Sequence, residues 1–155
     1  MNRSTQRYSD GHLYKLKIQL KHCRDTATVV LDRPEATVKC FEDLSRQPQE
    51  TVCVACLDTR NQLIVRHTVF VGSTDMVFFN PREILRTALL AMATRIVVVH
   101  NHPSGIPDPS RDDLEVTAKL NEACETIGIE LLDHVIIGRE GQFWSWALAG
   151  KPGDE

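Results

Sequence analysis

The side chains best suited to chemistry gather in one short segment, residues 100–113 of the 155-residue chain. His100 and His102 follow a run of four apolar residues, 96–99, which is typical of a buried strand. Because side chains alternate along a strand, both imidazoles point to the same side. Three prolines and a glycine then predict a fixed loop, and Ser110-x-x-Asp113 predicts the first turn of a helix.

Strand end, loop and helix start can bring His100, His102 and Asp113 to one point. Two imidazoles and a carboxylate are a zinc-type ligand set that leaves one coordination position for water. The structural alternatives are that each histidine is a hydrogen-bonded core residue and that Ser110 with Asp113 forms only a helix cap. A cap does not require two histidines on the preceding strand, so the complete string favours metal binding.

These residues carry a resemblance to a known family. The pattern His-x-His-Pro, six residues, Ser, two residues, Asp resembles that of the JAMM (MPN-plus) metallopeptidases. The fuller string His-Asn-His-Pro-Ser-Gly followed by Pro-Ser is similar to the RadC-like branch, from about Glu50 to about Gly150. The positions that match the motif are His100, His102, Pro103, Ser110 and Asp113.

The resemblance implies a zinc-dependent hydrolase of peptide or isopeptide bonds, with Zn²⁺ held by His100, His102 and Asp113. Zinc lowers the pKa of a bound water towards about 7, and such a site needs a base and an oxyanion donor. The family's base is a glutamate upstream of His-x-His, which matches Glu50, with Glu83 as the fallback. Ser110 matches the family's oxyanion-stabilising serine.

Two polar residues near the motif have less specific interpretations. His134 is a partner behind the metal ligands, another polar contact, or a buried strand residue, and we assign it no catalytic role. Asn101 lies between the histidines and faces the other way, so we interpret it as a residue that holds a loop.

Two other motifs favour packing over function. Cys53-x-x-Cys56 lies in a predicted strand, where residues three apart face opposite sides, so small buried hydrophobes are favoured over a redox or zinc pair. Trp144 and Trp146 share one strand face, and packing over the sheet is favoured over covering a groove.

Composition is that of one globular domain, with 42% hydrophobic and 25% charged residues. The five scattered cysteines, the absence of a secretory signal and the lack of a long apolar run predict a cytoplasmic protein without disulfides or membrane spans. A net charge of −3 does not indicate a basic surface for binding nucleic acid. The lysines of segment 13–21 alternate with apolar residues and indicate the solvated face of an edge strand.

The order of elements predicts an α/β class: one domain with a mixed β-sheet flanked by helices. The resemblance adds the JAMM/MPN (cytidine-deaminase-like) architecture. We divide the chain into an N-terminal strand and helix extension, 1–49, and a JAMM/MPN-like metal-dependent hydrolase domain, 50–150. Further strands are expected at 51–57, 62–70, 76–79, 129–137 and 143–148, and helices from Pro34, from Pro81 and over 110–128.

The alternative function is a catalytically weak or inactive RadC-like binding module associated with DNA metabolism. Longer RadC-like proteins carry an N-terminal helical DNA-binding region, whereas about 50 residues precede the match here and 14–20 is a predicted strand. We therefore do not expect direct nucleic-acid binding. The expected partner is a protein or peptide substrate.

Overall fold

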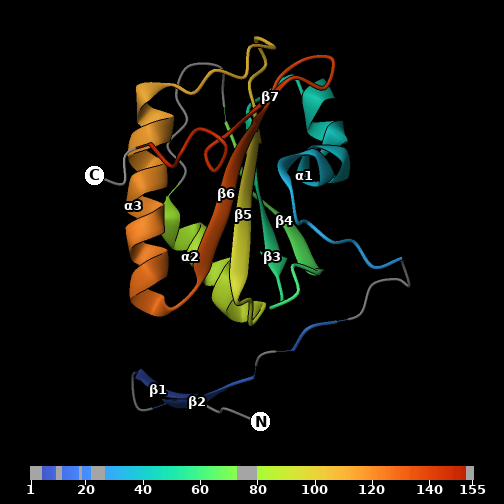
Figure 1. Ribbon diagram of the computed structural model, residues 1–155. Coiled ribbons are helices and arrows are strands. Elements are labelled where there is room, and N and C mark those ends of the chain that lie inside the picture. Colours follow the sequence, from blue (N-terminus) through green and yellow to red (C-terminus); the bar gives the residue numbers. More distant parts are fainter. Residues whose placement is uncertain (1–4, 10–11, 18, 22–26, 73–79, 153–155) are drawn as a thin grey trace.

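A five-stranded β-sheet with helices on both faces forms the centre of the computed structural model (Figure 1). The structure describes residues 5–9, 12–17, 19–21, 27–72 and 80–152. The strands of this sheet are β3 (Thr51–Leu57), β4 (Leu63–Val71), β5 (Arg95–Asn101), β6 (Glu130–Ile137) and β7 (Phe143–Ser145). The helices are α1 (Pro34–Cys40), the 3₁₀ helix η1 (Glu42–Arg46), α2 (Pro81–Leu90) and α3 (Arg111–Ile127).

The sheet is mixed, in the spatial order β4-β3-β5-β6-β7. Strand β3 is antiparallel to both β4 and β5, whereas β5 and β6 are parallel and are connected through α3. The hairpin β6–β7 closes the far edge. The predicted α/β class, mixed sheet and flanking helices are therefore confirmed.

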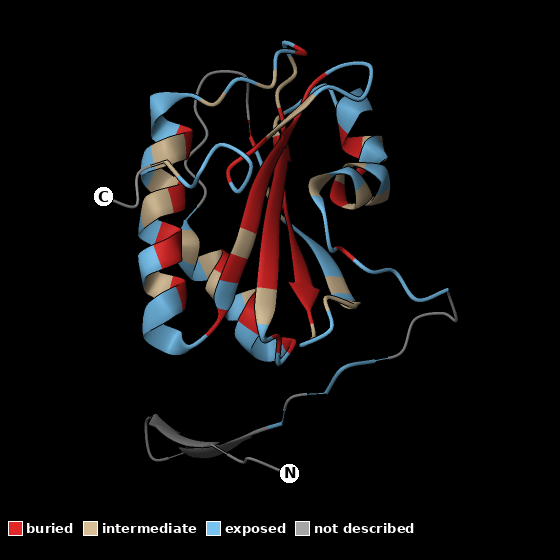
Figure 2. Ribbon diagram, in the orientation of Figure 1, coloured by how far each residue is buried: buried red, intermediate tan, exposed pale blue. Residues whose placement is uncertain are grey.

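Each face of the sheet has its own core, because side chains alternate along every strand. On one face, Val54 of β3 and Val98 of β5 pack with Ile84 of α2 and Leu120 of α3. On the other face, neighbouring strand residues pack with Phe41 and Leu44 beside α1 and η1. The middle strands are buried on both sides (Figure 2), so they give continuous apolar runs in the sequence.

Local sequence signals set the ends of the two long helices. The Asn80 side chain accepts a hydrogen bond from the Arg82 amide, and Pro81 occupies the first helical position of α2. Helix α3 begins with a capping box between Ser110 and Asp113 and ends at Gly128, whose φ of 73° is the left-handed conformation that glycine favours. These predicted boundaries are confirmed.

The N-terminal third differs from the prediction. Residues 5–9 form β1 (Thr5–Ser9) and pair antiparallel with β2 (His12–Leu16). The predicted strand 13–21 therefore ends at Leu16, and pairing with β1 rather than the alternation pattern sets its length. The apolar run 27–31 makes an isolated bridge between Val30 and Gln62. The helix predicted from Pro34 is present as α1.

Two further strand predictions have different outcomes. The strand predicted at 143–148 ends at Ser145 because the backbone then turns, with the Ala149 amide donating to the Ser145 carbonyl. Trp146 is fully buried in the core on the α2 and α3 face and Trp144 packs against that core, so the packing interpretation is confirmed. The strand predicted at 76–79 lies outside the described residues.

Within the described ranges, no helix has the length and apolar character needed to cross a membrane. The cytoplasmic location stays a prediction. The division of the chain at residue 50 also stays a prediction.

Candidate metal centre

Strands β3 and β5 place three of the chemistry-bearing residues at one end of the sheet. His100 is paired with Val52 in the antiparallel β3–β5 ladder. Extending this register by two residues puts Glu50, just before β3, opposite His102, just after β5. The His102 amide donates to the Ile137 carbonyl at 3.1 Å, which ties His102 to β6. Nonlocal strand pairing therefore brings Glu50 to the two histidines.

The loop after β5 delivers the fourth residue, Asp113. Gly105 has a φ of 86°, and its carbonyl accepts a hydrogen bond from the Arg139 amide at 3.0 Å. A Cβ atom at Gly105 would collide with the Arg139 side chain, so glycine is required at this close approach. The pinned loop leads directly into α3, whose first turn carries Asp113.

The four side chains converge closely enough to surround one ion. One possible ligand atom from each of Glu50, His100, His102 and Asp113 lies within 4.8 Å of the others. His100 Nε2 is 3.0 Å from His102 Nε2, 3.4 Å from Asp113 Oδ1 and 3.5 Å from Glu50 Oε1. Ligand atoms about 2.0–2.1 Å from a tetrahedral zinc lie roughly 3.3 Å apart, so these separations fit the ion.

The cluster is buried on one side and open on the other. The His100 side chain is inaccessible, whereas 16% of His102 and 17% of Glu50 are exposed. The Glu50 and His102 side of the cluster is therefore open to solvent.

Burial and neighbouring charges shift the titration of these groups in different directions. Burial raises the pKa of Glu50 to about 7, with the charge of His102 opposing the shift and that of Asp113 adding to it. Burial opposes ionisation of Asp113 as well, but the hydrogen bond to His102 and the nearby His100 and Ser110 hold its pKa below the usual value. Burial also lowers the pKa of His100 and lowers that of His134 to about 4, so both rings are neutral near pH 7.

A chain of hydrogen bonds runs behind His100. His100 Nδ1 is 2.7 Å from His134 Nε2, and His134 Nδ1 is 2.5 Å from the hydroxyl of Thr117. The Thr117 hydroxyl also contacts the Asp113 carbonyl at 2.6 Å. His134 is thus a partner behind the ligand-type residues, one of the three interpretations that its sequence left open. Thr117 was not singled out from the sequence, where its position four residues after Asp113 was the one signal available.

Asn101 holds the segment that carries Glu50. Its side-chain oxygen accepts from the Thr51 amide at 2.8 Å, and its amide nitrogen donates to the carbonyls of Gln47 and Gln49. The predicted loop-holding role is confirmed, and the loop it holds is the one that positions Glu50.

Two further candidate residues, Glu83 and Ser110, make structural contacts. Glu83, the fallback base, forms an ion pair with Arg86 on α2 and lies outside the four-residue cluster. The amide and hydroxyl of Ser110 donate to Asp113 Oδ2 at 2.8 Å each, so its capping role is present.

The cysteine pair has a structural role as well. Cys53 and Cys56 are buried in the cores on opposite faces of the sheet, and burial raises the pKa of Cys56 to about 11. The packing interpretation of this pair is confirmed. The described cysteines are free thiols, and Cys23 lies outside the described residues.

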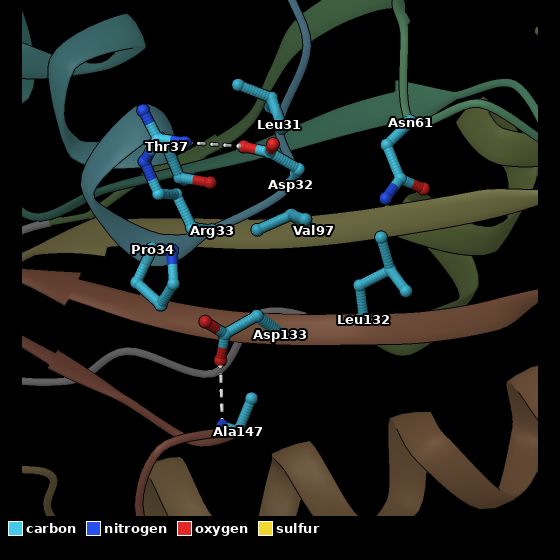
Figure 3. Close-up of a pocket in the computed structure, with 10 residues that line it drawn as sticks. All are labelled: Leu31, Asp32, Arg33, Pro34, Thr37, Asn61, Val97, Leu132, Asp133 and Ala147. Carbon is cyan, nitrogen blue, oxygen red and sulfur yellow. Dashed lines mark hydrogen bonds and ion pairs between the residues drawn. The ribbon is translucent and has the colours of Figure 1, made fainter.

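A small cavity of about 160 Å³ lies beside α1, on the face of the sheet opposite α2 and α3 (Figure 3). Its volume is below the roughly 300–1,000 Å³ of typical ligand pockets. Asp133 lines it, but this carboxylate accepts hydrogen bonds from the Ser145 hydroxyl and from the amides of His134 and Ala147. The cavity contains none of the four clustered residues.

Comparison with known proteins agrees with this geometry. A family model described as "RadC-like JAB domain" matches residues 31–151. The chain therefore belongs to the RadC-like JAB domain family, and the resemblance inferred from the His-x-His motif is confirmed.

Individual relatives share nearly half of the aligned residues. The chain is 45% identical over 114 residues to a UPF0758 protein of Streptococcus gordonii, covering 74% of this chain and 50% of the relative. It is 42% identical over 113 residues to a UPF0758 protein of Thermotoga maritima, covering 73% and 51%. The chain thus spans about half the length of these relatives, and their names state no activity.

Proposed function

We propose that the protein is a zinc-dependent hydrolase of peptide or isopeptide bonds. The observation that supports this most directly is the convergence of two imidazoles and two carboxylates on one point at the end of the sheet. His100, His102 and Asp113 are the proposed metal ligands, and Glu50 is the proposed base. Zn²⁺ held by these ligands would act as a Lewis acid and lower the pKa of a water molecule towards about 7.

Glu50 has the properties of a general base in such a reaction. Burial raises the pKa of Glu50 to about 7 in the metal-free protein. A carboxylate beside the metal centre can accept a proton from water and return it to the leaving amine. Glu50 lies on the open side of the cluster, where a substrate amide can approach. The hydrogen bonds of Asn101 hold the backbone on both sides of this glutamate.

Ser110 is the proposed donor to the developing oxyanion. Its hydroxyl donates to Asp113 Oδ2 in the structure, so this role requires the hydroxyl to turn towards the substrate. The amide of Ser110 would then remain bonded to Asp113 and keep the helix cap in place. Ser110 can therefore cap the helix and also donate its hydroxyl proton to the oxyanion during the reaction.

Metal content of the purified protein is the first test. We expect about one zinc per chain in the wild type and in His67→Ala, which changes an exposed histidine of β4 outside the cluster. We expect the zinc to be lost in His102→Ala. A folded wild-type protein that takes up no zinc after reconstitution would contradict the proposal.

Hydrolysis is tested separately with zinc-loaded protein on peptide and isopeptide substrates. Glu50→Gln should retain zinc and lose cleavage, whereas Glu83→Gln should retain both, since Glu83 lies outside the cluster. Cleavage that survives Glu50→Gln would contradict the assignment of the base. The DNA-associated binding module remains the alternative hypothesis, and a salt-dependent gel shift with duplex and branched DNA tests it.

A further inference from the structure

We propose that Thr117 and His134 are positioning residues that fix the tautomer of His100, so that the Nε2 lone pair of His100 faces the metal centre. The inference rests on the metal-binding part of the proposed function and is independent of hydrolysis. The three residues come from α3, β6 and β5, and they are connected by two short contacts in the buried interior.

The direction of the chain follows from the single proton of the Thr117 hydroxyl. The hydroxyl oxygen is 2.6 Å from the Asp113 carbonyl and 2.5 Å from His134 Nδ1. Both separations are those of hydrogen bonds, and a carbonyl oxygen can only accept. The hydroxyl therefore donates to Asp113, and His134 Nδ1 must carry the proton of the second bond.

This assignment propagates to His100. A neutral imidazole has one N–H, so His134 with a proton on Nδ1 has a bare lone pair on Nε2. That lone pair accepts from His100 Nδ1 at 2.7 Å, which places the proton of His100 on Nδ1. The Nε2 atom of His100 then carries a lone pair that points towards the other three residues of the cluster.

His102 has a comparable outer contact. Its Nδ1 is 2.9 Å from the Ile106 carbonyl, which can only accept, so Nδ1 is a donor. Its Nε2 lies 3.0 Å from His100 Nε2 and 3.4 Å from Asp113 Oδ2, so in the metal-free protein a proton on His102 Nε2 can be accepted by the lone pair of His100 or by Asp113. A metal ion would take the place of this proton, and hydrogen bonds from the outer nitrogen are the usual way in which proteins orient metal-binding histidines.

The experiment uses the zinc-free protein with ¹⁵N-labelled histidines, in which NMR distinguishes a protonated from a bare ring nitrogen. The wild type should show His100 and His134 protonated on Nδ1. In Thr117→Val, which has nearly the same volume but no hydroxyl, we expect the proton of His134 to move to Nε2 and that of His100 to move to Nε2 as well.

Two variants serve as controls. Thr117→Ser keeps the hydroxyl and should keep the wild-type tautomers. Thr126 lies on the same helix, and its hydroxyl donates to the carbonyl of Glu122, four residues earlier, at 3.0 Å. Because this hydroxyl contacts neither histidine, Thr126→Val should leave the tautomers unchanged.

Zinc affinity, measured with Zn²⁺ alone by competition with a chelating dye, gives the functional consequence. Thr117→Val should weaken binding about 10- to 100-fold, and both control variants should bind as the wild type does. A wild-type His100 protonated on Nε2, or a folded Thr117→Val with unchanged tautomers and affinity, would overturn the inference. The NMR result is obtained without metal or substrate, so failure to hydrolyse any amide would contradict the proposed function and leave this inference standing.

Discussion

Two buried aspartates on opposite sides of the sheet show how similar burial supports different roles. Asp113 is 5% exposed and Asp133 is 6% exposed. Asp133 accepts three hydrogen bonds from neutral donors, two backbone amides and the hydroxyl of Ser145. Asp113 bonds to Ser110 through Oδ2, while its Oδ1 faces His100 Nε2 at 3.4 Å. The structural carboxylate is held by backbone and hydroxyl donors, whereas the ligand-type carboxylate also faces the imidazoles of two other candidate ligands.

The neighbouring groups also shift the two aspartates in opposite directions. Burial raises the pKa of Asp133, and its hydrogen bonds only partly oppose this effect. The pKa of Asp113 is lowered despite burial, because His102, His100 and Ser110 favour the charged form. The comparison indicates that partner chemistry, rather than depth, separates the candidate metal site from the cavity beside α1.

Replacing each aspartate by asparagine should produce the largest contrast. Asp113→Asn should weaken zinc binding at least about 100-fold and abolish hydrolysis, because a proposed ligand is lost and such losses exceed those of the outer partners. Asp133→Asn should leave both unchanged, since its side chain faces away from the cluster. Zinc competition and substrate cleavage provide the measurements. Loss of zinc from Asp133→Asn would remove the distinction between the two sites.

The two serines that donate to these aspartates provide a second matched pair. Ser110→Ala and Ser145→Ala each remove a hydroxyl that donates to a buried carboxylate, at 2.8 and 2.7 Å. Each should destabilise the fold by about 1 kcal/mol. With zinc retained, Ser110→Ala should lower the hydrolysis rate about 100-fold if its hydroxyl serves the oxyanion, and Ser145→Ala should not. Equal rates would limit Ser110 to its capping role.

The stability role of Asp133 is tested by two substitutions at that position. Asp133→Ala leaves the amides of His134 and Ala147 without their acceptor and should cost at least about 2 kcal/mol in urea unfolding. Asp133→Asn should cost less than about 1 kcal/mol, because its oxygen still accepts from the amides and its nitrogen can donate to Ser145. Equal losses for both variants would show that these hydrogen bonds contribute little.

Most of the candidate site could be predicted because its signals are local. His100, His102, Ser110 and Asp113 lie within 14 residues, where strand alternation and a helix cap determine the direction of each side chain. The same holds for the start of α2 at Asn80-Pro81, where the capping chemistry is contained in adjacent residues.

The remaining features depend on contacts that the sequence does not encode locally. The place of Glu50 follows from the β3–β5 register, and only the family resemblance pointed to it. The role of Thr117 depends on where β6 places His134 beside α3. The lysine pattern of 13–21 predicted a strand, but pairing with β1 ends that strand at Leu16.

The smallest expected effect concerns folding stability in zinc-free protein. The contributions of the two aspartates to the free energy of unfolding should change with pH in opposite directions. The folded pKa of Asp113 is lowered, so its contribution to stability is present above about pH 4 and is lost as the pH falls further. The folded pKa of Asp133 is raised, so its contribution is greatest below about pH 4 and declines as the pH rises through the folded pKa.

Urea unfolding at about pH 3 and pH 6 should therefore give opposite trends for the two asparagine variants. The loss of stability caused by Asp113→Asn should be larger at the higher pH, and that caused by Asp133→Asn should be smaller there. These trends are within reach of the measurement, because one pKa unit corresponds to about 1.4 kcal/mol. If both losses changed in the same direction, the imidazoles would not be stabilising the charge of Asp113. The proposed electrostatic difference between Asp113 and Asp133 would then be contradicted.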